Sequence, residues 1–308
     1  MLPLIAPDWQ PQAPLQLLKF DWTRAAGIEL AVLRLDLIDP LISGNKWFKL
    51  RPYLHTAADA GFAGVMSLGG SHSNHLHALA GAGQRFAFPV VGLLRGEPQD
   101  TPTVRDLQTM GMQLHWLGYG GYRARHSADF WAPWQLRYPH LLAVAEGGLG
   151  LAAARSCADL RQQVQAQLAT LGWLDYDGWW LAAGTGTTLA GLVLAEAGAH
   201  PVYGALAVAP GHGADTQIAA LLNEAGVANQ GYHLFDACRR GFARTDPELL
   251  EFMHACETVS GVQFEPVYTA KALLALRHQV EAGYFAPATR LLFVHTGGLQ
   301  GRRALQLN

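Results

Sequence analysis

Short apolar runs alternate with helical patterns along most of the chain, and this alternation constrains the fold more than any other feature. Apolar runs separated by helical segments are typical of parallel strands that are covered by helices on both faces. The runs that predict strands span residues 30–35, 64–68, 89–94, 112–117, 141–145, 178–183, 202–208, 232–235 and 291–295. The sequence therefore predicts an α/β protein of parallel open sheets flanked by helices.

Helical patterns fill the spaces between these runs. Helices are predicted to begin near Ser73, Thr103 and Ser127, because serine and threonine side chains can cap the first amides of a helix. A long helix is predicted over residues 152–171. Further helices are predicted from Thr187 onward and over residues 214–225, 246–260 and 269–282.

The order of these elements predicts two lobes. A chain of 308 residues exceeds the usual size of one compact domain. Residues 48–147 are expected to form a smaller α/β domain, and residues 1–47 with 148–308 a larger one. The strand at 30–35 is assigned to the larger domain, because Lys46 then lies between the two lobes.

Composition excludes several classes of protein. Hydrophobic residues make up 50% of the chain and charged residues 15%, which excludes disorder as a dominant state. The net charge of −2 without a basic cluster argues against nucleic acid as a partner. No apolar run is long enough to predict a membrane span. The prolines in residues 1–16 and the lack of a positive segment there disfavour a secretory signal.

Cysteines and histidines predict neither disulfides nor a metal site. The three cysteines are widely spaced and odd in number, so a reducing cytoplasm is the expected location. His72, His75 and His77 lie close together in sequence, but no acidic or cysteine side chain lies at ligand spacing. No bound metal is therefore expected.

A lysine at a Gly-Asn turn gives the strongest chemical signal. Lys46 follows Gly44 and Asn45 and opens a helical pattern. A lysine held at a turn beside a pocket can form a Schiff base, because burial and cationic neighbours lower its pKa and free the amine. A lone lysine at a helix start is far more often a surface residue, so the other motifs decide its interpretation.

A glycine- and threonine-rich turn after the predicted strand at 178–183 is a candidate anion site. It consists of Gly184, Thr185, Gly186, Thr187 and Thr188. Amides and hydroxyls at the positive end of a helix suit a phosphate group. The turn matches neither the P-loop nor the dinucleotide-binding pattern, and a tight turn without a ligand is an alternative.

A second turn follows the predicted strand at 64–68. Its residues His72, Ser73, Asn74 and His75 offer amides and side-chain donors to a carboxylate, although a capped helix alone explains this turn better. One ligand could use the groups of this turn together with Lys46 and the turn at 184–188. That ligand is pyridoxal phosphate with an amino-acid substrate.

The ordered motifs extend over most of the chain. They are Gly44-Asn45-Lys46 with Lys49-Leu50, Gly69-Gly70 with Ser73-Asn74, Leu94-Arg95-Gly96-Glu97, Glu146-Gly147-Gly148, residues 184–191, residues 266–271, and His295-Thr296-Gly297-Gly298. This set resembles the 1-aminocyclopropane-1-carboxylate (ACC) deaminase/D-cysteine desulfhydrase family. The resemblance implies a pyridoxal-phosphate enzyme of the tryptophan-synthase β-like fold, with the cofactor on the larger domain, and a homodimer.

The resemblance also implies roles for the matched residues. Lys46 is expected to carry the cofactor, Asn74 to contact its phenolic oxygen, and the loop at 184–188 to hold its phosphate. Ser73, with the neighbouring histidines, is expected to bind the substrate carboxylate or to assist proton transfer. Tyr268 resembles the active-site tyrosine of the family.

Two positions favour the desulfhydrase branch. Thr269 resembles the residue that faces the pyridine nitrogen, where the deaminase branch has a glutamate. A neutral hydroxyl there implies a weaker electron sink, which suits elimination of a thiol. Phe242 is the best match to a second tyrosine of the family and lacks the hydroxyl. The family's arginine between the two lysines is replaced by Phe48, and its next glutamate by Arg51.

These features predict a pyridoxal-phosphate-dependent lyase or deaminase that acts on a small amino acid. A D-cysteine desulfhydrase-like β-elimination that yields a keto acid and ammonia is favoured. ACC deamination is the first alternative, and a non-catalytic protein that binds pyridoxal phosphate or amino acids is the second. A nicotinamide-dependent oxidoreductase is more distant, because the dinucleotide-binding pattern is missing.

Overall fold

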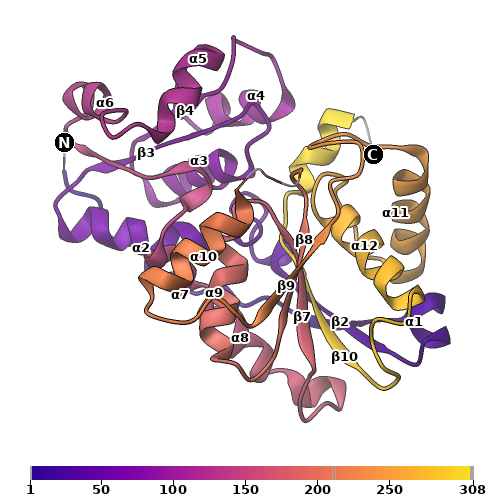
Figure 1. Cartoon of the computed structure of the whole chain (residues 1–308). Helices are drawn as coiled ribbons and strands as arrows, with labels where there is room; N and C mark the ends of the chain where they lie inside the picture. Colours follow the sequence, from indigo (N-terminus) through magenta and orange to yellow (C-terminus); the bar gives the residue numbers. More distant parts are fainter. Residues whose placement is uncertain (1, 210, 212, 306–308) are drawn as a thin grey trace.

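The computed structural model describes residues 2–209, 211 and 213–305, which form two sheets (Figure 1). The larger sheet has the strand order β1-β2-β10-β7-β8-β9 and the smaller sheet β5-β4-β3-β6. The strands of the larger sheet are β1 (Leu15–Leu18), β2 (Glu29–Arg34), β7 (Gly178–Ala183), β8 (Val202–Leu206), β9 (Tyr232–Asp236) and β10 (Arg290–His295). Those of the smaller sheet are β3 (Gly64–Gly69), β4 (Val90–Leu94), β5 (Gln113–Trp116) and β6 (Leu141–Ala143).

The predicted architecture of parallel open sheets is confirmed. Each predicted strand is present, and its ends differ from the prediction by at most two residues. The strand that the sequence does not predict is β1, which pairs antiparallel with β2, whereas the other strand pairs of both sheets are parallel. The strands between residues 48 and 147 form the smaller sheet, while the residue boundaries of the two domains stay a prediction.

Helices connect and cover the strands. They are α1 (Asp21–Ala25), α2 (Lys46–Asp59), α3 (Asn74–Phe86), α4 (Pro102–Thr109), α5 (Gly118–Arg123), α6 (Ala132–Arg137), α7 (Leu151–Ser156), α8 (Ala158–Gln165), α9 (Thr187–Glu196), α10 (Ala214–Glu224), α11 (Pro247–Ser260) and α12 (Thr269–Glu281). Short 3₁₀ helices are η1 (Leu35–Leu37), η2 (Ala124–His126), η3 (Glu146–Gly148), η4 (Leu168–Leu171) and η5 (Leu299–Leu305).

Some helix predictions are wrong in detail. Ser127 does not start a helix, because its backbone is extended and its hydroxyl donates back to the Ala124 carbonyl. The predicted helix at 152–171 is divided at Cys157, whose amide bonds three residues back instead of four and so tightens the turn. Thr101 rather than Thr103 caps α4, whereas Ser73 caps α3 as predicted.

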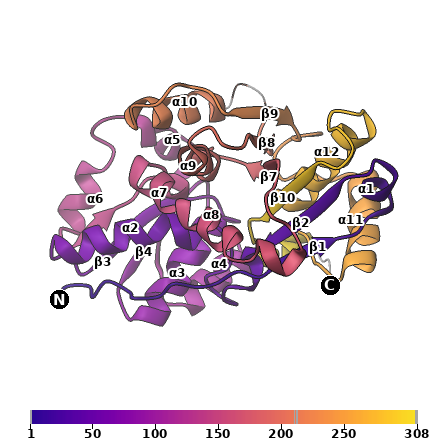
Figure 2. The same ribbon diagram turned by 90° about the horizontal axis from the view of Figure 1, so that it is seen from below.

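The larger sheet is buried on both faces. Trp179 and Trp180 are neighbours on β7 and point to opposite faces, and both are fully buried. Trp179 packs with residues of α8 and α9, and Trp180 with residues of α11 and α12. Figure 2 shows α7, α8 and α9 between the smaller sheet and the region of α1, α11 and α12. Helix α2 contacts both β3 and α7, so it joins the two sheets.

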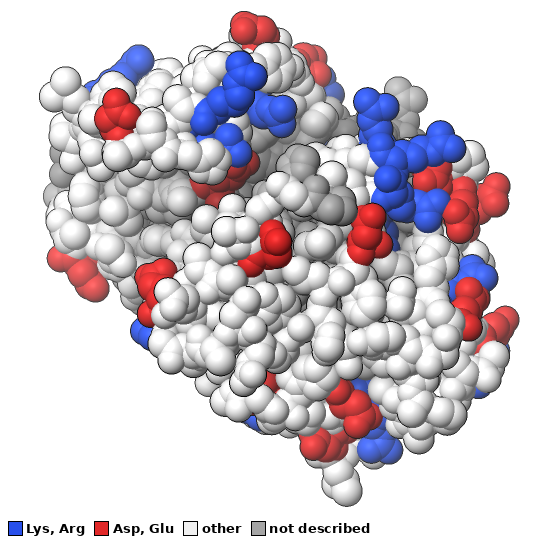
Figure 3. Space-filling view, viewed as in Figure 1, with Lys and Arg blue, Asp and Glu red and all other residues white. Residues whose placement is uncertain are grey.

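The surface agrees with the low charge of the sequence. On the face seen in Figure 3, lysine and arginine side chains form small separate groups with acidic side chains nearby, and most of the surface is uncharged. Within the described residues, no helix combines the length and apolar character that a membrane crossing requires.

Candidate active site

The turn that carries Lys46 packs against the carboxyl end of β10. Gly44 has a left-handed backbone with φ of +84°, and a Cβ atom there would lie 2.1 Å from the Thr296 carbonyl oxygen. The Asn45 amide donates to the same oxygen at 3.3 Å. The turn is therefore fixed by close backbone contact, and Lys46 follows it as the first residue of α2.

The two lysines at the start of α2 have weakened basicity. Lys46 is half-buried and its Nζ donates to Asn45 Oδ1 at 2.9 Å. Burial lowers the pKa of Lys46 to about 8, although Cys157 and Glu265 act in the opposite direction. Burial and the charge of Lys46 lower the pKa of Lys49 to about 7. Both amines are therefore partly uncharged near neutral pH, as a nucleophilic lysine requires.

The turn after β7 is shaped for an anion. Gly186 occupies the N-cap position of α9 with φ of +74° and offers no side-chain cap. A Cβ atom at Gly186 would lie 2.4 Å from Ile218 Cγ1, so the turn requires glycine. The amides at the start of α9 lie at the positive end of the helix dipole, where anions bind.

Hydroxyl groups and side chains of α2 surround this turn. Lys49 Nζ donates to Thr185 Oγ1 at 3.3 Å, and Thr185 Oγ1 lies 3.2 Å from Thr187 Oγ1. Asn45 Nδ2 donates to Thr188 Oγ1 at 2.8 Å across 143 residues of sequence. The first turns of α2 and α9 therefore meet. Their amides, hydroxyls and lysine amine fit a phosphate group.

The start of α3 presents a mixed set of polar groups. Ser73 Oγ accepts from the Leu76 amide at 3.2 Å and so caps its own helix. Asn74 Oδ1 accepts from Gln300 Nε2 at 2.8 Å. His72 is exposed and its pKa is lowered by partial burial of the ring. The serine and the asparagine are half-buried, so both can contact a ligand.

His75 lies deeper than the rest of this turn. Its Nε2 lies 2.8 Å from Ser67 Oγ, and Ser67 donates its own hydrogen to the Val144 carbonyl. His75 is therefore the donor in the first contact. Burial and the charges of Lys49 and Lys46 lower the pKa of His75 well below its usual value, so the ring is neutral. Its Nδ1 is buried and makes no hydrogen bond with any described residue.

A buried carboxyl group that the sequence analysis does not predict, that of Glu265, lies just before α12. Glu265 accepts hydrogen bonds from the amides of Val267, Tyr268 and Thr269. Burial raises the pKa of Glu265 to about 7. Thr269 Oγ1 accepts from the Glu265 amide at 2.8 Å and is fully buried. The signal that could have found Glu265 is an acidic residue placed to cap the first amides of a helix.

An aromatic ring, that of Tyr268, lies beside the turn at 184–188, and a second ring packs on it. A Cβ atom at Gly184 would lie 3.5 Å from Tyr268 Cε1. The ring of Phe242 packs on Tyr268 with centroids 5.8 Å apart and an interplanar angle of 69°. Burial, together with the charge of Glu265, raises the pKa of Tyr268, so its hydroxyl keeps its proton. Lys271 Nζ donates to the carbonyl of Gly241 at 2.8 Å and thereby holds the turn before Phe242.

Sequence comparison supports the resemblance. No protein-family model matches the chain. A Pyrococcus furiosus protein, whose name assigns it provisionally to the ACC deaminases, is 26% identical over an alignment that covers 94% of this chain and 90% of that protein. The mitochondrial bifunctional D-cysteine desulfhydrase/ACC deaminase of Arabidopsis thaliana is 26% identical over an alignment that covers 89% of this chain and 73% of that protein. This chain is their relative.

Structural comparison agrees with this relationship. The crystal structure of an ACC deaminase homologue matches with a TM-score of 0.84 at 24% identity, covering 100% of this chain and 96% of that one. The resemblance to the deaminase/desulfhydrase proteins and the predicted fold are therefore confirmed. The roles of individual residues stay predictions.

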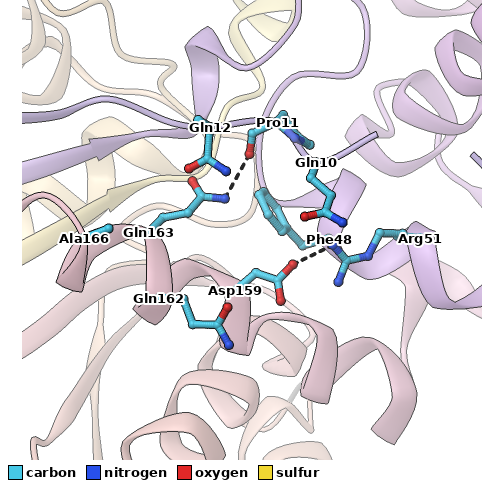
Figure 4. A pocket seen from close by; sticks show the side chains of 9 residues that line it. All are labelled: Gln10, Pro11, Gln12, Phe48, Arg51, Asp159, Gln162, Gln163 and Ala166. Atoms are coloured by element: carbon cyan, nitrogen blue, oxygen red, sulfur yellow. Dashed lines mark hydrogen bonds and ion pairs between the residues drawn. The ribbon is translucent and has the colours of Figure 1, made fainter. Parts of the chain in front are cut away.

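Two cavities of this deaminase/desulfhydrase relative do not include Lys46 among their lining residues. The first, of about 230 Å³, is lined by Gln10, Pro11, Gln12, Phe48, Arg51, Asp159, Gln162, Gln163 and Ala166 (Figure 4). Two side-chain contacts join residues of its lining: a 2.6 Å ion pair between Arg51 and Asp159, and a hydrogen bond that Gln163 Nε2 donates to the Pro11 carbonyl at 2.9 Å. The second, of about 580 Å³, lies beside α3 and includes Gln84 and Gln300.

No group of three acidic, cysteine or histidine side chains that could hold a metal occurs among the described residues.

Proposed function

We propose that this protein is a pyridoxal-phosphate-dependent lyase that acts on a small amino acid, with the cofactor attached to Lys46. The observation that supports this most is the hydrogen-bonded chain from Lys46 through Asn45 to Thr188. This series of hydrogen bonds connects a lysine amine of lowered pKa to the turn at 184–188, which we propose as the phosphate site. Lys49 and Thr185 would hold the phosphate together with the amides of α9.

The side chains around Lys46 supply the proton transfers. When bound, pyridoxal phosphate supplies an electron sink for charge that develops on the Cα atom of an amino acid. The Lys46 amine, freed when the amine of the substrate takes its place, would be the base that removes the proton from Cα, and its lowered pKa of about 8 suits this role near neutral pH. Ser73 and the amides at the start of α3 would bind the carboxylate. The protonated hydroxyl of Tyr268 is the acid available to the leaving group.

Thr269 and Phe242 favour β-elimination over ring opening as the reaction. The Thr269 hydroxyl is neutral and is already bonded to the Glu265 backbone. Phe242 brings a hydrocarbon ring, rather than a second hydroxyl, against Tyr268. Opening of a cyclopropane ring without an α-proton needs a strong electron sink and several acid–base groups. Elimination of a thiol mainly needs removal of the α-proton.

An assay of two substrates tests this proposal. With one preparation of cofactor-loaded protein, we expect the rate of sulfide and pyruvate formation from D-cysteine to exceed that of ketobutyrate formation from ACC at least about tenfold. The variant Phe242→Tyr introduces the hydroxyl of the family's second tyrosine. It is expected to lower the ratio of the rate with D-cysteine to the rate with ACC. Faster ketobutyrate formation by the wild-type protein would establish the ACC deaminase reaction instead. Turnover of neither substrate would favour another amino acid or the non-catalytic alternative.

A further inference from the structure

One hydrogen bond between two carboxamides joins the start of α3 to the C-terminal segment. Gln300 Nε2 donates to Asn74 Oδ1 at 2.8 Å, and both residues are half-buried. A carboxamide has an acceptor oxygen on one side and a donor nitrogen on the other. Because Gln300 holds the oxygen, this contact fixes the direction in which the Asn74 nitrogen points.

The nitrogen of Asn74 remains as a free donor. Nδ2 has no hydrogen-bond partner in the described part of the chain. It lies 2.6 Å from the position that a Cβ atom would take at Gly298, whose φ is +87°. The adjacent Gly297 packs directly on Gly44, with its Cβ position 2.5 Å from the Gly44 Cα atom. The Asn74 donor therefore lies beside the turn that carries Lys46.

Gln300 itself is held firmly in place. It belongs to η5, which is drawn in yellow near the C-terminus in Figure 1 and contacts α4. Arg302 pairs with Glu257 of α11, and Arg303 pairs with Asp106 of α4. These ion pairs attach η5 to helices of both lobes. The backbone segment that carries Gln300 is therefore anchored by contacts that do not involve Asn74.

We infer that Gln300 is a positioning residue, which holds Asn74 Oδ1 so that Asn74 Nδ2 donates to the phenolic oxygen of pyridoxal phosphate. The inference rests on the proposed function and extends it to a residue outside the family motif. A donor at this oxygen stabilises its anionic form. Loss of the correct amide orientation should therefore raise the pH at which the visible absorbance band of the loaded protein titrates.

The variant Gln300→Glu tests this inference most sharply. A carboxylate of nearly the same shape accepts from Asn74 Nδ2, so it turns the Asn74 oxygen toward the cofactor. We expect an upward shift in the titration of the visible band and about tenfold weaker retention of pyridoxal phosphate. Gln300→Leu removes the contact without adding charge and should shift both readouts in the same direction. In an Asn74→Ala background, Gln300→Glu should have no further effect.

Gln84→Glu is the matched control. Gln84 lines the same 580 Å³ cavity as Gln300, but it lies near the far end of α3, whereas Asn74 is the first residue of that helix. The Gln84→Glu variant should match the wild-type protein in the titration of the visible band and in cofactor retention. A cooperative thermal unfolding transition shows for each variant that the protein is folded. A wild-type protein without a visible band overturns the proposed function and this inference with it. If the wild-type protein has the band, two results would overturn this inference alone. The first is that Gln300→Glu leaves the titration of the band unchanged. The second is that Gln300→Glu shifts the titration by the same amount in the Asn74→Ala background.

Discussion

Replacement of Lys46 by alanine is expected to remove the visible absorbance band of the pyridoxal-phosphate-loaded protein. The amine that attaches the cofactor and takes the α-proton is then lost, so turnover of D-cysteine should fall at least about 1,000-fold. The absorbance spectrum and the rate of pyruvate formation measure these two effects on the same sample. A truncation on the first turn of α2 leaves the hydrogen bond between Asn45 and Thr188 in place, so the fold should persist.

Lys49→Ala is the matched comparison, because it removes a lysine three residues later on the same helix. Lys49 contacts Thr185 in the phosphate cradle and not the attachment point. We expect this variant to keep the band and to retain the cofactor about tenfold less tightly. If Lys49→Ala loses the band and Lys46→Ala keeps it, the roles of the two lysines are exchanged.

Gly44→Ala is expected to cause the largest loss of stability among substitutions at the site. The new Cβ atom would lie 2.1 Å from the Thr296 carbonyl oxygen on a backbone with φ of +84°. Left-handed strain and steric overlap add, so the free energy of unfolding should fall by at least about 3 kcal/mol. Urea denaturation of the cofactor-free protein measures this change. Cofactor retention should also weaken, because the turn that carries Lys46 must move.

Gly61→Ala provides the control for this substitution. Gly61 also has a left-handed backbone, with φ of +75°, but no atom lies within 4 Å of its Cβ position. Its replacement should therefore cost only the backbone strain, about 1 kcal/mol. An equal loss of stability in the two variants would show that the contact between Gly44 and Thr296 does not hold the turn.

The parallel strands were predictable because their signal is local. Strand β7 reads as an apolar run that ends at glycine and threonine, and its burial on both faces requires such a run. Strand β1 carries no comparable signal, because it has four residues and only two buried side chains. Its segment is held from a distance, since the Leu15 amide donates to Gln167 and the Ala13 amide to Gln163. Contacts across 150 residues leave no local pattern.

In the candidate site, too, residues with a local sequence signal could be predicted, and residues placed by long-range contacts could not. Lys46 and the cradle at 184–188 could be singled out, because glycine turns after parallel strands gather at one edge of a sheet. For Glu265 the sequence offers only a capping signal, because an acidic residue before proline is typical of an exposed loop and its burial depends on tertiary packing. Gln300 could not be singled out, since only the fold brings it to Asn74 across 226 residues.

Borohydride reduction of the loaded wild-type protein, followed by peptide mapping, tests the attachment at Lys46 most directly. The chain has only four lysines, Lys19, Lys46, Lys49 and Lys271, so the modified position can be assigned without ambiguity. Lys19 is exposed and outside the site, and Lys271 donates to two backbone carbonyls. The proposed attachment predicts one reduced cofactor group, on Lys46. Modification of Lys49 or Lys271 instead, or of no lysine, would contradict it.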